Sequence, residues 1–241
     1  MHDLLTSYFW HGDTLRSRSV SGIVHAALLD VPEPPARLAA DWQREIATNV
    51  LLEPGDVEPM PLARARTRTR WPDYAQCVQA MSGWLGTLGL PASLLPASDV
   101  ALMACRGARY HHDGAQYGGA AFCNLFLSED KGLDVHFPVT GHRIPLTRGT
   151  ALLFDTGQPH AVVPRGTDHG FDAADFPSSI DRTQLFLTWE LSIEDAQVAR
   201  LLGVGFDVDP VTASRLGEEQ VWVNGEPAEV CASSGRWRSA E

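Results

Sequence analysis

Short apolar segments separated by turn residues run from about residue 99 to residue 191, and no other feature of the sequence constrains the fold as much. The intervening stretches are rich in Gly, Pro, Asp and Ser, as in SEDKG at 128–132. A series of short strands joined by such turns predicts an antiparallel sandwich or barrel. The candidate strands are 100–105, 120–127, 133–138, 143–145, 150–154, 160–164 and 185–191.

Helical periodicity dominates the part of the chain before residue 99. Apolar residues recur every fourth position over 38–50, and a similar pattern follows over 72–88, so we expect two amphipathic helices packed on a sheet. The run SVSGIVHAALLDV predicts one strand. Four arginines between 63 and 70 form either a solvated loop or a clamp for an anionic ligand. The fold class expected is therefore mainly β with flanking helices (α+β).

The C-terminal segment predicts a smaller appendage. SIEDAQVARLLG is typical of a helix capped by Ser192 and ended by Gly203, and a short helix is expected near 210–216. Asn224-Gly225 is a preferred two-residue hairpin turn. We expect a single domain, 1–241, in which a helical N-terminal part (1–98) supports a β core (99–191) and an appendage (192–241) either covers the core or forms a homodimer contact.

Composition and charge exclude several classes of partner. The chain carries 19 basic and 30 acidic residues, a net charge of −11, so its surface should repel nucleic acid and anionic membranes. Neither a signal peptide nor an apolar stretch of membrane-spanning length is recognisable. The four cysteines are scattered without a Cys-x-x-Cys pair, which favours reduced thiols over a zinc motif. These features predict a cytoplasmic protein.

A His-x-Asp pattern at 111–113 carries the clearest chemical signal. In an extended strand the side chains of His111 and Asp113 share one face, whereas His112 points away. His160 follows 47 residues later, after strands that could return it beside this pair. Two imidazoles and one carboxylate on one face of a metal are the ligand set of non-haem Fe(II) oxygenases. The same pattern at 11–13 is not followed by comparable strands.

Several segments together resemble a known family. They are RYHHDG, CNLFLSED, GLDVHFP, IPLTRGTALLFDTGQPHAVVP and RTQLFLTWEL. In this order they resemble the core of the Fe(II)/2-oxoglutarate-dependent dioxygenases, particularly the branch related to prolyl hydroxylases, over residues 100–191. The resemblance implies a double-stranded β-helix, a jelly-roll or cupin-like barrel.

The resemblance also implies residue roles. His111, Asp113 and His160 would be the catalytic metal ligands, with His142 and His169 as competing third ligands. Arg182, on the expected last core strand, would bind the far carboxylate of 2-oxoglutarate, and Arg165 is the fallback for this role. In the purely structural interpretation, Arg182 only pairs with a surface acid such as Asp181.

Other polar positions keep two interpretations each. Asn124 would contact the co-substrate or only its own sheet. Tyr117, in the glycine-rich loop GAQYGG, would close over substrate or lie in a surface loop without function. His11, His25 and His136 are expected to be structural.

The activity implied is oxidation of a small-molecule substrate, with Fe(II) as cofactor, 2-oxoglutarate and O2 as co-substrates, and succinate and CO2 as co-products. Halogenating relatives carry a small residue at the carboxylate position, so Asp113 favours hydroxylation, desaturation or cyclisation. Two alternatives remain open: a cupin-like metalloenzyme that does not use 2-oxoglutarate, and a non-catalytic β-barrel binding module. The helical N-terminal region and the insertion at 166–181 are the expected specificity elements.

Overall fold

Fifteen strands dominate the computed structural model, which describes residues 4–60, 67–167 and 169–239. The strands are β1 (Leu5–His11), β2 (Thr14–Ser19), β3 (Val24–Leu28), β4 (Val57–Met60), β5 (Asp99–Cys105), β6 (Ala108–His111), β7 (Ala120–Phe126), β8 (Leu133–Phe137), β9 (His142–Pro145), β10 (Thr150–Asp155), β11 (His160–Pro164), β12 (Gln184–Ser192), β13 (Gln220–Val223), β14 (Glu226–Val230) and β15 (Trp237–Ser239). The helices are α1 (Ala36–Glu45), α3 (Thr67–Arg70), α4 (Tyr74–Thr87), α5 (Ala196–Leu202) and α6 (Pro210–Ala213), with single turns η1 (Ile46–Val50), η2 (Leu95–Ala97) and η3 (Ala173–Asp175).

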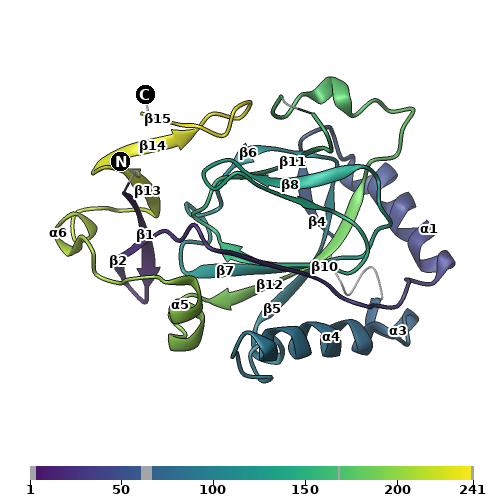
Figure 1. Ribbon diagram of the computed structural model, residues 1–241, viewed down its shortest axis with the longest axis horizontal. Coiled ribbons are helices and arrows are strands. Elements are labelled where there is room, and N and C mark those ends of the chain that lie inside the picture. The colour runs from purple at the N-terminus through teal and green to yellow at the C-terminus, as the bar shows by residue number, and fades with distance from the viewer. Residues whose placement is uncertain (1–3, 61–66, 168, 240–241) are drawn as a thin grey trace.

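These strands form three antiparallel sheets. Their strand orders are β3-β10-β7-β12-β5-β4, β6-β11-β8-β9 and β15-β14-β13-β1-β2. From β5 to β12 the chain alternates between the first two sheets, apart from the β8–β9 hairpin, which is a jelly-roll-like order. In Figure 1 these two sheets face each other at the centre, while the five-stranded sheet lies at the left. The mainly β class with helices is therefore confirmed.

Strand β12 has two buried faces. Leu187, Trp189 and Leu191 point to the large core cluster that includes helix α4, which lies beneath the six-stranded sheet in Figure 1. Phe186, on the opposite face, belongs to the cluster enclosed between the two facing sheets. Because successive side chains alternate in a strand, burial on both sides explains why LFLTWEL is almost continuously apolar.

The N-terminal part differs from the expected helical one. The predicted helices are present as α1, extended by η1, and as α4, and the predicted strand is β3. Strands β1, β2 and β4 were not expected. Strand β1 pairs on one side with β13, more than 200 residues away, as in Leu5 opposite Val223. On its other side it forms a hairpin with β2 through the turn at Gly12 and Asp13, a local feature that the sequence-based prediction missed. Of the arginine-rich segment, residues 63–66 lie outside the described residues, and Arg70 pairs with Asp41 at 2.5 Å.

The appendage follows its prediction except at one cap and at β15, a strand that was not expected and that pairs with β14. Helix α5 is capped not by Ser192 but by Asp195, whose carboxylate accepts hydrogen bonds from two backbone N–H groups. Ser192 instead ends β12, paired with Ala120. Gly203 ends the helix with φ +67°, and Asn224 and Gly225 form the expected turn with positive φ. Among the described residues, none of the helices has the length and apolarity needed to cross a membrane.

Candidate metal centre

Strand pairing between β6 and β11 brings the predicted ligands together. His111 is the last residue of β6 and His160 is the first residue of β11, and the two stand opposite each other in the antiparallel register. Asp113 follows two positions after His111, and its backbone N–H donates to the Thr156 carbonyl at 2.8 Å. A single strand pair thus places His111 and His160, 49 positions apart in the sequence, side by side.

The three side chains converge on one point. Nε2 of His111 lies 3.7 Å from one Asp113 carboxylate oxygen, and Nε2 of His160 lies 3.6 Å from the other. The ligand atoms all lie within 4.8 Å of one another. Metal–ligand bonds of about 2.0–2.2 Å fit donors at such separations. Two imidazoles and a carboxylate on one side also leave further coordination positions open, so this donor set fits Fe(II).

Backbone carbonyls orient both imidazoles. Nδ1 of His111 hydrogen-bonds the Arg109 carbonyl at 2.7 Å, and Nδ1 of His160 hydrogen-bonds the Gln158 carbonyl at 3.1 Å. A carbonyl only accepts, so each Nδ1 carries the proton and each Nε2 is left with a free lone pair. Metal-binding histidines are commonly oriented in this way. Both rings are therefore held in the tautomer that can bind a metal through Nε2.

Burial keeps His160 neutral. Its side chain is packed against the rings of Phe137 and Phe154, at centroid distances of 5.9 and 4.9 Å. Burial, followed by the neighbouring His111, lowers the pKa of His160 to about 4. The neutral imidazole is the form that coordinates metals. His111 and Asp113 are only partly buried, so the open side of the centre is on their side.

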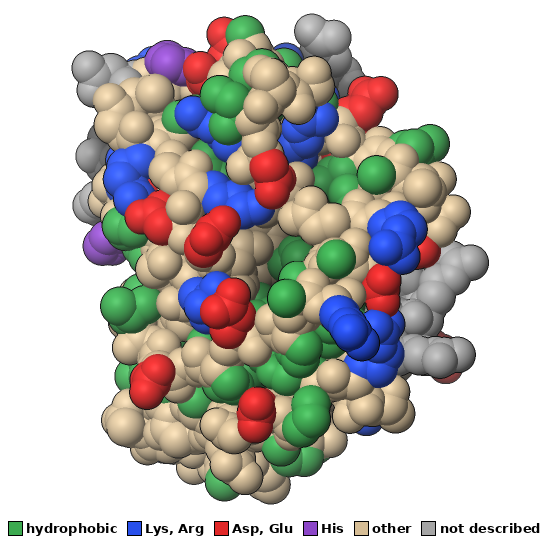
Figure 2. Space-filling view, turned by 90° about the vertical axis from the view of Figure 1, so that its right-hand side faces the viewer, with side chains coloured by type: hydrophobic (Ala, Val, Ile, Leu, Met, Phe, Trp, Pro, Cys, Tyr) green, Lys and Arg blue, Asp and Glu red, His purple; other side chains and the backbone are tan. Residues whose placement is uncertain are grey.

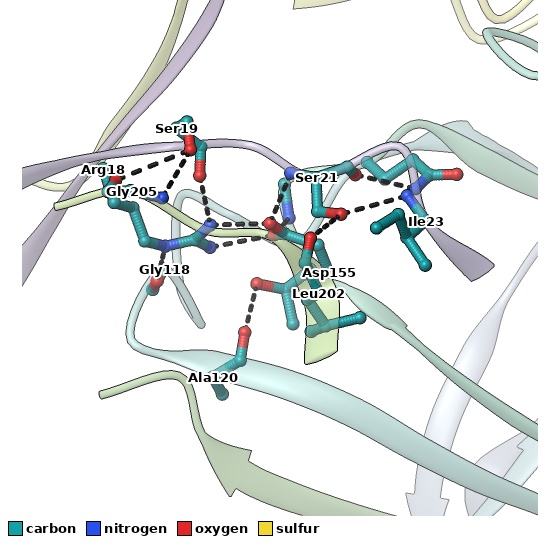
Figure 3. A network of polar contacts seen from close by, with 12 residues as sticks. Arg18, Ser19, Ser21, Ile23, Gly118, Ala120, Asp155, Leu202 and Gly205 are labelled. Atoms are coloured by element: carbon teal, nitrogen blue, oxygen red, sulfur yellow. Dashed lines mark hydrogen bonds and ion pairs between the residues drawn. The ribbon is translucent and has the colours of Figure 1, made fainter. Parts of the chain in front are cut away.

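A buried ion pair supports the loop between Asp113 and β7. Arg18 of β2 pairs with Asp155 at the end of β10 through two bonds of 2.7 and 2.9 Å, and both side chains are fully buried. Its Nε also donates to the Gly118 carbonyl at 2.7 Å, as Figure 3 shows. Thr156, the residue after Asp155, donates to the carbonyl oxygens of Tyr117 and Ala120. Sequence reasoning missed Arg18, because a charged residue in LRSRS carries no sign that it is buried.

Asn124 lies on the inward face of β7. Its Oδ1 accepts a hydrogen bond from the Thr188 hydroxyl of β12 at 2.9 Å, and both residues are 7% exposed. Asn124 also stands opposite Leu152, which belongs to the cluster between the two sheets. In the described part of the chain its Nδ2 donates to no acceptor. The sheet contact is thus present, and the amide N–H2 remains available to a ligand.

Arg182 is not on the last core strand. It lies two residues before β12, with its guanidinium 6.0 Å from the centre of the Phe176 ring. Asp181, named above as its structural partner, pairs instead with Lys131 at 2.6 Å. The fallback, Arg165, donates to Asp130 and Asp134, each at 2.7 Å, so its guanidinium is already neutralised by two carboxylates.

The competing histidines lie elsewhere. His142 is exposed on β9, and His169 pairs with Asp175 at 2.7 Å. His11, of the second His-x-Asp pattern, sits at the β1–β2 turn and contacts Glu194 at 2.9 Å. His136 bonds the Tyr110 hydroxyl, and the His112 ring packs on Trp237. Of the described residues, the only cluster of potential metal ligands is therefore the predicted one.

Gln184 is a polar residue whose surroundings the sequence does not reveal. It is fully buried, and neither its amide oxygen nor its amide nitrogen has a hydrogen-bond partner among the described residues. It shares the inward face of β12 with Phe186 and Thr188. A buried amide without partners costs free energy, so this position is suited to a polar ligand or water.

Solved structures that match this chain share little sequence identity with it. No protein-family model and no curated protein matches the sequence. A prolyl-4-hydroxylase of Pseudomonas putida is 20% identical, with 70% of this chain and 92% of that chain covered and a TM-score of 0.38. The non-haem alpha-ketoglutarate-dependent epimerase SnoN from nogalamycin biosynthesis is 12% identical, with 71% and 78% covered and a TM-score of 0.37.

The matching structures thus include prolyl hydroxylases and an alpha-ketoglutarate-dependent epimerase, which are proteins of the kind that the motifs resemble. The polyketide cyclase RemF from Streptomyces resistomycificus also matches, at 13% identity and a TM-score of 0.27, over 39% of this chain and about half (54%) of that one. The roles of individual residues rest on the geometry described above.

Proposed function

We propose that the chain is an Fe(II)- and 2-oxoglutarate-dependent oxygenase that oxidises a small molecule. The observation that carries this proposal is the convergence of two Nε2 atoms and one carboxylate, with both Nδ1 protons held by backbone carbonyls. We further propose that the facing sheets close as a double-stranded β-helix and that the chain works as a single domain.

His111, Asp113 and His160 would hold the iron, and Asp113 would balance one of its two charges. Bound Fe(II) with 2-oxoglutarate and O2 supplies the oxidising chemistry, with succinate and CO2 as co-products. The protein side chains bind and orient. The rings of Phe137 and Phe154 exclude water from the His160 side, and the open side near Asp113 admits substrate. An occupied carboxylate position supports hydroxylation, desaturation or cyclisation.

Polar groups between the sheets fit an organic acid. The unpartnered amide of Gln184 and the free Nδ2 of Asn124 offer donors on inward faces of β12 and β7. We propose Arg182, two residues before Gln184, as the cation for the far carboxylate, since Arg165 is already paired with two carboxylates.

The setting proposed is cytoplasmic, without nucleic-acid or membrane partners. The four cysteines are free, and burial raises the pKa of Cys77 and Cys105 to about 12. Figure 2 shows one face of the molecule on which Lys and Arg side chains lie beside Asp and Glu, without a patch of one sign. Together with the net charge of −11, this supports a small-molecule substrate.

An anaerobic Fe(II) titration with and without 2-oxoglutarate tests the proposal. The wild type should develop the weak visible charge-transfer band of the chelated co-substrate. His111→Ala and His160→Ala should lose it, with metal affinity reduced by more than about 100-fold, because each removes a ligand. His142→Ala, an exposed histidine on β9, is the matched control and should behave as the wild type.

Two other outcomes would contradict the proposal. Iron binding without the band, and without succinate release, would favour a metalloenzyme that does not use 2-oxoglutarate. Failure of the wild type to bind iron would favour a non-catalytic binding module.

A further inference from the structure

Glu190 is a carboxylate on the inward face of β12 that the proposed reaction does not use. It shares that face with Phe186 and Thr188, because side chains alternate along the strand. In the six-stranded sheet it stands opposite Phe122 of β7 on one side and Asp99 of β5 on the other. The side chains of such directly opposed residues lie next to each other on the same face.

Aromatic rings connect Glu190 with the metal centre. The Phe154 ring lies 4.9 Å from the His160 ring, and the Phe122 ring lies 6.1 Å from the Phe154 ring. Tyr117, in the loop after Asp113, contacts Phe122 at 5.2 Å. Since Phe154 and Glu190 flank β7 on either side, they are separated by about two strand spacings, roughly 10 Å. A small molecule is long enough to contact both Phe154 and Glu190.

Glu190 has no cationic partner within the described part of the chain. It is only partly exposed, and burial, followed by the nearby Asp99, raises the pKa of its carboxyl group. Asp99 stands directly opposite Glu190 on β5, so the immediate surroundings of Glu190 are negative. An anionic group held partly out of water without a counter-charge is destabilising, and a bound cation would relieve that cost.

We propose that Glu190, together with the rings of Tyr117 and Phe122, binds a positively charged nitrogen of the substrate, so that the substrate is a small organic cation. A carboxylate beside aromatic rings is a combination that binds ammonium and guanidinium groups, through an ion pair and through cation–π attraction. The assignment of this cation as substrate rests on the proposed function. The binding site itself does not depend on catalysis and is tested by binding alone.

Matched pairs of charged and neutral probes test the site. Binding of choline, n-butylammonium and ethylguanidinium is measured by calorimetry on the anaerobic Fe(II)-loaded protein. 3,3-Dimethylbutan-1-ol, which has the shape of choline without its charge, is the neutral comparison. At least one cation should bind, and choline, if it is that cation, at least about 10-fold more tightly than its neutral counterpart.

Glu190→Gln preserves shape and removes the charge. The substitution should lower the affinity for the bound cation by about 10- to 100-fold and leave the affinity for the neutral probe unchanged. Glu58→Gln, at an exposed carboxylate on β4 of the same sheet, is the control and should leave cation binding as in the wild type. Absence of binding by all three cations, equal binding of choline and its neutral counterpart, or an unchanged affinity in Glu190→Gln would overturn the proposal.

Metal-free protein and His160→Ala separate this proposal from the function proposed above. Metal-free wild type and His160→Ala should both retain cation binding, because the cation site does not require the metal. If the wild type itself failed to bind iron but still bound the cation, the oxygenase assignment would be contradicted and the cation site would stand. Normal iron and 2-oxoglutarate binding with no Glu190-dependent cation binding would contradict only the substrate class.

Discussion

At the scale of single residues, Asp113 combines a side-chain and a backbone role. Its carboxylate lies between the two imidazoles, and its backbone N–H donates to Thr156. Asp113→Asn keeps the shape and the backbone bond but replaces a charged ligand by a neutral amide. We expect Fe(II) affinity to fall by at least about 10-fold with the fold preserved. Asp13→Asn, in the other His-x-Asp pattern, is the control for a Co(II) or Fe(II) titration; equal affinity in both variants would contradict the role of Asp113.

At the scale of elements, the Arg18–Asp155 pair joins β2, the end of β10 and the loop after Asp113. Arg18→Met leaves a fully buried carboxylate without its cation, although the Ser21 and Gly157 N–H groups still donate to it. We expect a loss of about 3–5 kcal/mol in the free energy of unfolding, measured by urea denaturation, and weaker metal binding. In a double-mutant cycle with Asp155→Asn, the combined loss should be clearly smaller than the sum; additive losses would show that the two side chains are not coupled.

At the scale of the whole molecule, Tyr8 ties the N-terminal strand to the appendage. It is 1% exposed and donates to Asp209, 201 residues away, at 2.9 Å. Burial, followed by Asp209, raises the pKa of Tyr8 to about 12, against about 10 in an unfolded chain. The neutral phenol therefore stabilises the fold fully below pH 10, and this contribution is lost as pH rises from about 10 through 12.

Urea denaturation between pH 8 and pH 12 checks this dependence. Tyr8→Phe should be about 1 kcal/mol less stable than the wild type at pH 8, because it lacks the hydrogen bond. Above pH 10 the stability of Tyr8→Phe should decline less steeply, and the wild type should lose about 2–3 kcal/mol relative to it over the window, so that the two curves cross. Parallel curves across the window would contradict the raised pKa of Tyr8.

Sequence-based prediction succeeded where the signal was local. The turn residues separated the core strands, because they depend on neighbours within a few positions. His111 and Asp113 do lie close together, although β6 ends at His111 and Asp113 follows the strand, where a shared strand face had been expected. The prediction failed at Ser192, where pairing with Ala120 extended the strand past the expected cap. It also placed Arg182 on a strand that begins only at Gln184, because a strand ends where its partner ends, and the partner β5 stops at Cys105.

By itself, the sequence determined a mainly β chain with an aligned histidine and aspartate and a second histidine that the strands could return. Only the tertiary structure decided that β11 pairs with β6, that Arg18 is buried against Asp155, and that Glu190 faces inward without a cation. The physical reason is the separation in sequence over which each effect acts. Backbone alternation acts over two to four residues, whereas burial and ion pairing depend on segments that meet only when distant strands share a sheet.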